Sequence, residues 1–325
     1  MRPAIGRAPR TARAAVVGAW LATACTSDGG AVGPTPDPVP GPGDFTRVLA
    51  FDGRTRNYLL HVPAAGPSGF TRPLVLAFHG VPSSPQQMQA ITGLDALADR
   101  EGFVVAYPQA VEDWSTGCAH CSSRAFLLNI DDVGFVRALI RQLEVDAGID
   151  PRRVYAAGFS NGALFVHRLA CDAADRIAAF ASVGATALVP AAVPPCEPGT
   201  RVPIVFFHGS LDPNFPPEGR SFGEGPTGIS TLSIGETLSA WVNRNGCQPV
   251  TPQRTVLPDL EPDGTTAARE SWSGCGRGEL IYYEITGGGH TWPGSPASFS
   301  EFLGPESHDV AASEVIVNFF LSRAL

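Results

Sequence analysis

The segment Arg153–Gly162, with the sequence RVYAAGFSNG, restricts the fold more than any other part of the chain. An apolar run stands directly before Gly-Phe-Ser-Asn-Gly, and a helical pattern begins at Gly162. In a strand–G-x-S-x-G–helix unit, the serine sits on a sharp, strained turn with its hydroxyl exposed. The alternative is an ordinary glycine-rich turn with the serine as a helix cap, which would be favoured if the flanking strand and helix patterns were absent. The pattern therefore predicts that Ser160 is a nucleophile at the end of a buried strand.

Short apolar runs alternate with helical patterns along the rest of the chain. Runs without polar alternation are typical of strands buried on both faces, and strands that alternate with helices favour a parallel sheet. We therefore predict an α/β fold, a mainly parallel doubly wound sheet with helices on both faces and an antiparallel hairpin at one edge. The expected strands are 45–51, 56–62, 73–78, 102–107, 153–157, 177–183, 202–207 and 279–285, and the expected helices are 86–100, 132–147, 162–170, 233–244 and 310–323.

A serine hydroxyl needs a base that accepts its proton, and histidine is the usual one. His290 follows the predicted strand 279–285 across three glycines, in a loop that can carry an imidazole over the nucleophile. His79 and His208 each precede a glycine at a strand end, where we expect them to shape the backbone. The remaining histidines precede the turn at Ser160, lie near it or fall at the start of the last predicted helix. His290 is therefore the predicted base.

The base needs an acid to orient it. Asp212 follows the predicted strand 202–207 and lies between Ser160 and His290 in the sequence. This gives the order Ser, Asp, His that is expected of an α/β-hydrolase. Asp131 and Asp132 are rival carboxylates, but they precede Ser160 and are explained by a helix N-terminus.

Acyl transfer also needs two backbone N–H groups directed at the developing oxyanion. One is expected from Asn161, directly after the nucleophile, and the other from Val81, in the loop after the PLVLAFHG segment. The alternative for that loop is a simple tight turn at His79-Gly80.

Composition excludes several other classes of protein. All 23 basic residues are arginines, so Schiff-base, P-loop and Ser-Lys chemistry are excluded. The net charge is −8, and no basic stripe marks a surface for nucleic acid. We expect no metal and no organic cofactor, because a Ser-His-Asp site needs neither.

The N-terminal segment has the layout of an export signal. Four arginines are followed by the apolar run 14–24 and then by Cys25, so residues 1–25 are expected to be a signal peptide. The LATAC sequence also resembles a bacterial lipoprotein signal, and a lipid on Cys25 would be the one route of membrane attachment; the alternatives are simple cleavage nearby and a buried cysteine. Residues 26–43 contain five glycines and five prolines and are expected to be a linker before a domain over 44–325.

Six further cysteines are an even number, as expected for disulfides in an exported protein. Proximity in the sequence favours three pairs, which are Cys118–Cys121, Cys171–Cys196 and Cys247–Cys275. A redox dithiol or half of a zinc site at 118–121 is the alternative, but the chain has no second C-x-x-C.

Seven segments in this order resemble secreted α/β-hydrolases of the polyhydroxybutyrate depolymerase-like and feruloyl esterase-like group: PLVLAFHG, GFVVAYPQ, the stretch from Trp114 to Cys118, DDVGFVRALI, GFSNGA, FFHGSLDP and GGGHTWPG. The resemblance implies an α/β-hydrolase fold over most of 45–325 and a catalytic triad of Ser160, Asp212 and His290. It also implies that Trp114 and Trp292 lie near the acyl pocket, and we count His79 as a further substrate-binding candidate. The alternative for both tryptophans is that they are core or loop-packing residues.

The function expected from these residues is that of a secreted or surface-tethered serine esterase acting on small or oligomeric carboxylic esters. Aromatic walls would suit hydroxycinnamoyl and other soluble esters better than solid polyhydroxybutyrate. The alternatives are an acyltransferase of the same fold and a tethered binding module without catalysis.

Overall fold

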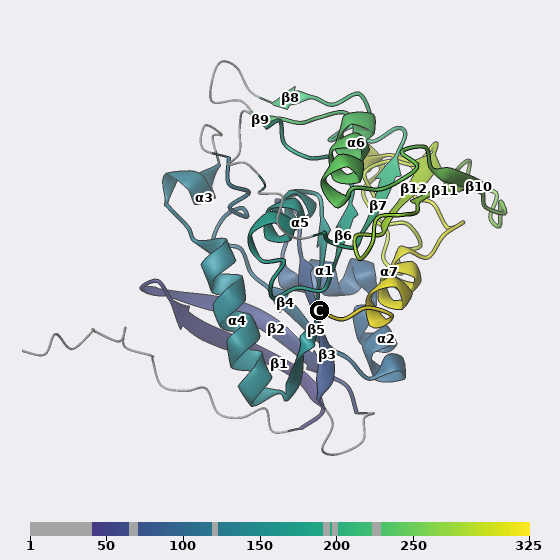
Figure 1. The fold of residues 1–325 in the computed structure, drawn as a ribbon. Coiled ribbons are helices and arrows are strands. Elements are labelled where there is room, and N and C mark those ends of the chain that lie inside the picture. The colour runs from purple at the N-terminus through teal and green to yellow at the C-terminus, as the bar shows by residue number, and fades with distance from the viewer. Residues whose placement is uncertain (1–40, 65–70, 119–122, 191–195, 197–200, 223–228) are drawn as a thin grey trace, which may run out of the picture. The chain divides into compact units, whose positions relative to one another are not determined.

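The computed structural model describes residues 41–64, 71–118, 123–190, 196, 201–222 and 229–325. The strands of its main sheet are β1 (Gly43–Phe51), β2 (Arg54–Val62), β3 (Arg72–Phe78), β4 (Val104–Pro108), β5 (Ile149–Phe159), β6 (Ala179–Val183), β7 (Ile204–Gly209), β10 (Gln253–Val256), β11 (Thr266–Trp272) and β12 (Leu280–Thr286). Their order across the ten-stranded sheet is β1-β2-β4-β3-β5-β6-β7-β12-β11-β10 (Figure 1). The strands from β4 to β12 in that order pair in parallel, and the two outer strands at each side pair antiparallel.

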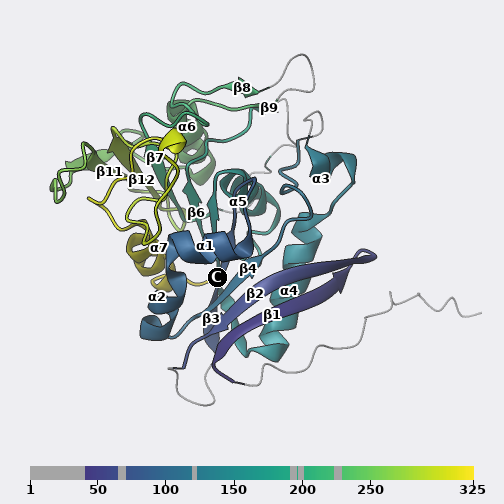
Figure 2. The same ribbon diagram turned by 180° about the vertical axis from the view of Figure 1, so that it is seen from behind.

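The helices cover both faces of this sheet. Alternate residues of β5 belong to two different cores: Val154 packs with the helices α4, α5 and α6, and Tyr155 packs with α1, α2 and α7. Figure 2, which views the molecule from the opposite side, shows α1, α2 and α7. The predicted doubly wound arrangement is therefore confirmed. The helices are α1 (Pro85–Thr92), α2 (Leu94–Glu101), α3 (Arg124–Leu127), α4 (Asp132–Asp146), α5 (Asn161–Asp172), α6 (Ile234–Asn245) and α7 (Ala312–Leu321).

The predicted edge hairpin forms as β1 and β2. Phe51 pairs with Arg54, and the two residues between them turn the chain. Asp52 has φ 49° and Gly53 has φ 68°, and a two-residue turn with both angles positive matches the twist of the strands that it joins.

Two expectations about elements were wrong. The helix expected over 86–100 is two helices, because Gly93 has φ 58° and breaks the regular helix between α1 and α2. The predicted strands omitted β10, β11 and the short strand β8 (Ser221–Phe222), which pairs with β9 (Ile229–Ser230).

Two of the three expected disulfides lie within the described residues. Cys171 is bonded to Cys196, and Cys247 is bonded to Cys275, as proximity in the sequence predicted. Cys118 is buried, and its expected partner, Cys121, lies outside the described residues. The expected signal peptide, Cys25 and nearly all of the expected linker also lie outside them. None of the described helices is long and apolar enough to cross a membrane.

Candidate active site

The turn between β5 and α5 has the strained geometry that the G-x-S-x-G pattern predicts. Ser160 has φ 57° and ψ −120°, values that a residue with a side chain rarely adopts. A Cβ on Gly158 would collide with the backbone of Gly162, and a Cβ on Gly162 would collide with the carbonyl group of Phe78 in β3. Both glycines are therefore needed for the close approach of strand, turn and helix that holds the serine in place.

The hydroxyl group of Ser160 does not cap the helix that follows it. Its side chain accepts no capping hydrogen bond from α5, although Ser160 occupies the cap position. Its backbone N–H instead donates to the carbonyl oxygen of Val183, at the end of β6, at 3.0 Å. Backbone contacts thus fix the residue while its Oγ stays available for chemistry.

The loops after β7 and β12 bring an aspartate and a histidine together. Nδ1 of His290 lies 2.7 Å from Oδ2 of Asp212, and both side chains are buried. Oδ1 of Asp212 accepts the N–H groups of Asn214 and Phe215, each at 2.8 Å. These two donors fix the carboxylate, so Nδ1–H of His290 donates to it and Nε2 is left as the proton acceptor.

Aromatic rings hold the His290 imidazole beside the serine. Its ring centroid lies 4.9 Å from that of Phe159, the residue before Ser160, and 5.7 Å from that of Phe215 on a nearly parallel plane. The backbone N–H of His290 donates to the carbonyl oxygen of Leu303 at 2.6 Å. The structure therefore brings all three predicted triad residues to the carboxyl ends of the parallel strands β5, β7 and β12.

The two expected oxyanion donors flank the same serine. Asn161 is the first residue of α5, where the backbone N–H has no partner within the helix. A Cβ on Gly80 would lie 3.0 Å from Cβ of Ser160, so the loop that carries Val81 is close to the nucleophile. The N–H of Val81 donates to no residue in the described part of the chain.

His79 shapes this loop from beneath. Its Nε2 accepts the N–H of Ala110 at 3.2 Å, so its Nδ1–H donates to the carbonyl oxygen of Gly80 at 2.7 Å. Burial lowers the pKa of His79, which favours this neutral form. The ring is 1% exposed and both of its nitrogens are engaged, so it positions backbone and offers no face to a substrate.

The two tryptophans expected beside the acyl pocket are core residues instead. Trp114 is 0% exposed and stacks on Phe165 of α5, and its Nε1–H donates to the carbonyl oxygen of His79. Trp292 is 1% exposed and donates to Oγ of Ser313. The expectation that these two rings form aromatic walls of the acyl pocket is therefore wrong, because both rings are buried in the core.

The rival carboxylates have structural roles. Oδ1 of Asp131 accepts the N–H of Gly134 as the cap of α4. Asp132 is fully buried, forms an ion pair with Arg56 at 2.6 Å and accepts the N–H of Ser115. This pair anchors the loop before α3 to β2, a role that the sequence did not reveal.

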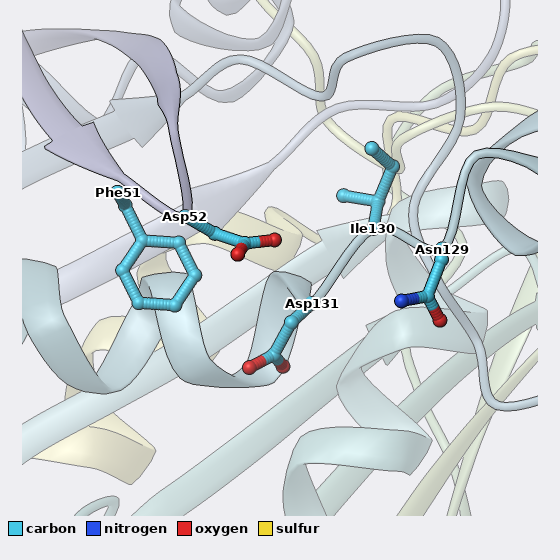
Figure 3. A pocket seen from close by; sticks show the side chains of 5 residues that line it. All are labelled: Phe51, Asp52, Asn129, Ile130 and Asp131. Carbon is cyan, nitrogen blue, oxygen red and sulfur yellow. The ribbon is translucent and has the colours of Figure 1, made fainter.

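A separate open pocket of about 520 Å³ lies between the β1–β2 turn and the start of α4. Its lining includes neither a histidine nor a serine, and one of its carboxylates is the cap of α4, so it offers no second nucleophilic site. Figure 3 shows the residues that line it, which are Phe51, Asp52, Asn129, Ile130 and Asp131.

A second buried histidine supports the strand end beside the site. Nδ1 of His167, on α5, accepts Nε1–H of Trp241, and its Nε2 lies 3.2 Å from Oγ of Ser182 in β6. Burial lowers the pKa of His167 to about 4. The neutral imidazole thus joins α5 and α6 to β6, one residue before the carbonyl group that holds the N–H of Ser160.

This histidine makes folding dependent on pH. Because the pKa of His167 is about 4 when folded and 6.5 when unfolded, the unfolded chain binds more protons between these values. The free energy of unfolding is therefore expected to rise with pH across this window, by about 3 kcal/mol from His167. Urea unfolding of the wild type and of His167→Gln at pH 4.5 and 7 checks this. The difference between the two pH values should shrink in the variant; an unchanged difference would contradict it.

A parallel α/β sheet with a serine on a strand-to-helix elbow, and a His-Asp pair beyond the later strands, defines an α/β-hydrolase. A profile of the family described as "Esterase PHB depolymerase" matches residues 56–212. The chain is also 33% identical over 288 residues to "Putative esterase NocK" of Nocardia uniformis subsp. tsuyamanensis, a match that covers 85% of this chain and 82% of that protein. The chain belongs to this family of esterases.

More distant similarities agree with the fold. "Feruloyl esterase B" of Piromyces equi is 30% identical over 238 residues, and the match covers 69% of this chain but only 41% of that protein, so the chain spans less than half of that relative. An acetyl xylan esterase from Aspergillus awamori superposes with a TM-score of 0.54 at 15% identity, over 77% of this chain and 94% of that one.

Proposed function

We propose that this esterase is a serine carboxylic ester hydrolase in which Ser160, His290 and Asp212 form the catalytic triad. The observation that carries the proposal is the buried Asp212–His290 hydrogen bond, placed beside the strained elbow of Ser160 by Phe159. A base oriented by a carboxylate next to an available serine hydroxyl is the arrangement that activates serine as a nucleophile.

The reaction proceeds in two halves. Nε2 of His290 takes the proton of Ser160 as Oγ attacks the ester carbonyl carbon, and the protonated imidazole then delivers that proton to the departing alcohol. The acyl group remains on Ser160. Water then attacks the acyl-enzyme with His290 again as base, and the carboxylic acid leaves.

In both halves the carbonyl oxygen becomes negatively charged. The N–H groups of Asn161 and Val81 donate to this oxyanion, and the hydrogen bond from His79 to the carbonyl group of Gly80 fixes the peptide that carries the second donor. The adjacent α5 N-terminus adds a favourable dipole.

A cavity of about 450 Å³ is the candidate site for the apolar part of the substrate. It runs along α5 from Leu164, one helical turn after Ser160, toward Trp241 of α6. Leu164 and Leu188 also pack in one cluster with Phe215, the residue stacked on His290. A hydroxycinnamoyl group, as in the substrates that the name feruloyl esterase implies, would find apolar contacts there.

An ester panel tests the function. We expect soluble acetyl, butyryl, feruloyl and oligomeric hydroxybutyrate esters to be hydrolysed much faster than solid polyhydroxybutyrate. Adding an alcohol acceptor at high concentration separates hydrolysis from acyl transfer, since a transferase would form the new ester in preference to free acid. Clearing of polymer granules without hydrolysis of any soluble ester would contradict the proposed substrates, and no turnover at all would favour a binding module.

Filling the cavity tests its role. Ala240 is an exposed residue of α6 on the cavity wall, and Ala240→Trp is expected to raise KM for methyl ferulate by about tenfold while acetyl esters change little. Ser239→Trp, at the neighbouring exposed position that does not line the cavity, is the matched control. Equal effects of the two variants on both esters would show that the apolar group binds elsewhere.

We also propose that the enzyme is exported, with residues 1–25 as its signal and the sulfur of Cys25 as a candidate lipid attachment point. The disulfides Cys171–Cys196 and Cys247–Cys275 support an oxidising compartment. In a bacterial host, globomycin or Cys25→Ser should change processing if Cys25 is lipidated, whereas unchanged processing would favour ordinary cleavage.

A further inference from the structure

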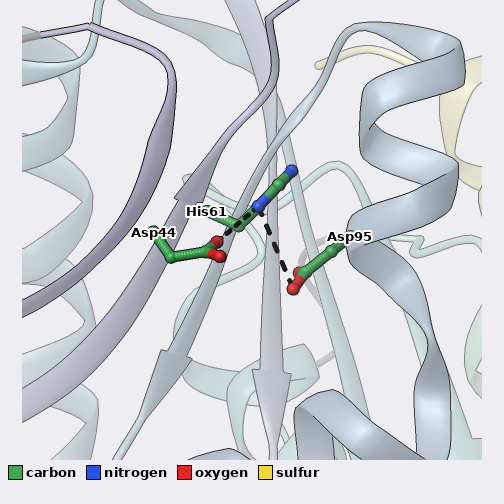
Figure 4. A group of neighbouring side chains, drawn as sticks. All are labelled: Asp44, His61 and Asp95. Atoms are coloured by element: carbon green, nitrogen blue, oxygen red, sulfur yellow. Dashed lines mark hydrogen bonds and ion pairs between the residues drawn. The ribbon is translucent and has the colours of Figure 1, made fainter.

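A second cluster of ionisable side chains lies at the β1 side of the sheet, where the chain enters the domain. Asp44 of β1 and His61 of β2 are directly paired across the two strands, so their side chains emerge on the same face. Asp95 and Asp99 are one turn apart on α2 and face them. Figure 4 shows His61 between the carboxylates of Asp44 and Asp95.

Three possible donor atoms of this cluster lie close together. Nδ1 of His61 lies 2.6 Å from Oδ1 of Asp44 and 3.9 Å from Oδ2 of Asp95, and one donor atom from each of the three residues lies within 4.8 Å of the other two. Ligands at the usual zinc distances of 2.0–2.2 Å stand roughly 3.3 Å apart in a tetrahedron. The two separations from Nδ1 of His61 bracket this value, so small side-chain rotations would bring the donors to tetrahedral spacing.

Neighbouring groups already orient two of the three donors. Nε2 of His61 lies 3.3 Å from Oδ1 of Asp99, the contact by which metal-bound histidines donate their second N–H to a carboxylate. The two oxygens of Asp95 accept from the hydroxyl of Tyr107 at 2.7 Å and from Nε2 of Gln89 at 2.6 Å. These contacts fix the carboxylate of Asp95 and the imidazole of His61, whose Nδ1 lies beside Asp44 and Asp95.

The cluster carries more negative charge than its neighbours neutralise. Three carboxylates surround one imidazole, and the chain has no lysine. Within the described ranges, no ion pair brings an arginine to Asp44, Asp95 or Asp99. The site therefore favours a cation.

We propose that Asp44, His61 and Asp95 form a structural Zn²⁺ site, with Asp99 as the positioning residue of the histidine and water as the fourth ligand. One imidazole nitrogen with two carboxylates is a donor set that suits zinc better than Ca²⁺ or Mg²⁺, which take oxygen ligands. The side chain of Asp44 is 71% exposed, which gives the ion a path from solvent.

Zinc replaces the proton on Nδ1 of His61. The nitrogen lone pair forms the new bond to the ion, and the displaced proton passes to the solvent without any change of oxidation state. The bound ion would tie the first strand of the domain to β2 and α2. This tie is structural, and it is independent of the esterase mechanism.

Calorimetry on the full chain, stripped with a chelator and dialysed, tests the site with Zn²⁺ alone and with Ca²⁺ and Mg²⁺ for comparison. We expect one zinc ion per chain, binding that weakens as pH falls, and a zinc-dependent rise in the melting temperature. Asp44→Asn, at an exposed position, should weaken zinc affinity by 10-fold or more, and Asp99→Asn by about 10–100-fold.

Matched controls separate this site from adventitious binding. Asp52→Asn lies at the other end of the same hairpin, and His308→Gln removes an exposed histidine elsewhere, so both should bind zinc as the wild type does. Equal affinity in the wild type and Asp44→Asn, or no binding at all, would overturn the proposal. Activity on a soluble ester should survive removal of zinc at temperatures where the protein is folded. A failed esterase assay would therefore contradict the proposed function, whereas a failed zinc titration would contradict only the zinc site.

Discussion

Replacing Asp212 by asparagine is expected to lower kcat by about 10⁴-fold while the protein stays folded. The carboxylate accepts Nδ1–H of His290 at 2.7 Å and so leaves Nε2 free to take the proton of Ser160. An asparagine amide can instead donate to Nδ1, which stabilises the tautomer with its proton on Nε2. Steady-state kinetics with a soluble ester, beside a thermal melt, measures the effect.

Asp132→Asn is the matched control for that experiment, since it is the same substitution at another buried aspartate upstream of the elbow. It removes the negative charge that compensates the buried Arg56 guanidinium 2.6 Å away, which costs up to about 3–5 kcal/mol of stability. Its kcat should be nearly that of the wild type wherever the variant is folded. A larger loss of kcat in Asp132→Asn than in Asp212→Asn would show that the acid has been misassigned.

Replacing Ser160 by alanine is expected to have the largest effect, a loss of about 10⁶-fold in kcat. Oγ is the atom that bonds to the acyl group, and no other group in the triad can substitute for it. The side chain makes no capping hydrogen bond with α5, so the melting temperature should change little. Hydrolysis of a soluble ester by the purified variant is the measurement; turnover within tenfold of the wild type would place the nucleophile elsewhere.

The parts of the site that could be predicted are those that depend on local sequence patterns and on the order of residues along the chain. Ser160 is marked by Gly158 and Gly162 on either side of it. Gly158 packs against the backbone of Gly162, and Gly162 packs against the carbonyl group of Phe78, so neither position has room for a Cβ. Asp212 and His290 could be placed because carboxyl ends of parallel strands share one edge of the sheet. Their 2.7 Å contact is consistent with that reasoning.

Burial was harder to predict than position. Trp292 lies two residues after His290, and Trp114 follows β4, but each ring turns into a core, and only the packing of Phe165 and Ser313 around them reveals this. The sequence indicates which strand, helix or loop carries a residue, whereas the direction of its side chain depends on neighbours from distant segments.

The cluster around His61 could not be predicted for a related reason. Asp44 and His61 meet only because the β1–β2 register pairs them, and Asp95 arrives from a helix that the sequence placed within one longer helix. No spacing typical of metal ligands marks these three residues in the chain. The register of one hairpin and a break at Gly93 were needed to bring them together.

Intact-mass spectrometry after treatment with a fluorophosphonate ester tests the central assignment most directly. This reagent phosphonylates an activated serine, and the adduct is stable enough to be located by peptide mapping. The wild type is expected to gain one adduct, on the peptide that contains Ser160, and Ser160→Ala to gain none under the same conditions. An adduct on another residue, or equal labelling of the variant, would contradict the assignment of Ser160 as the nucleophile.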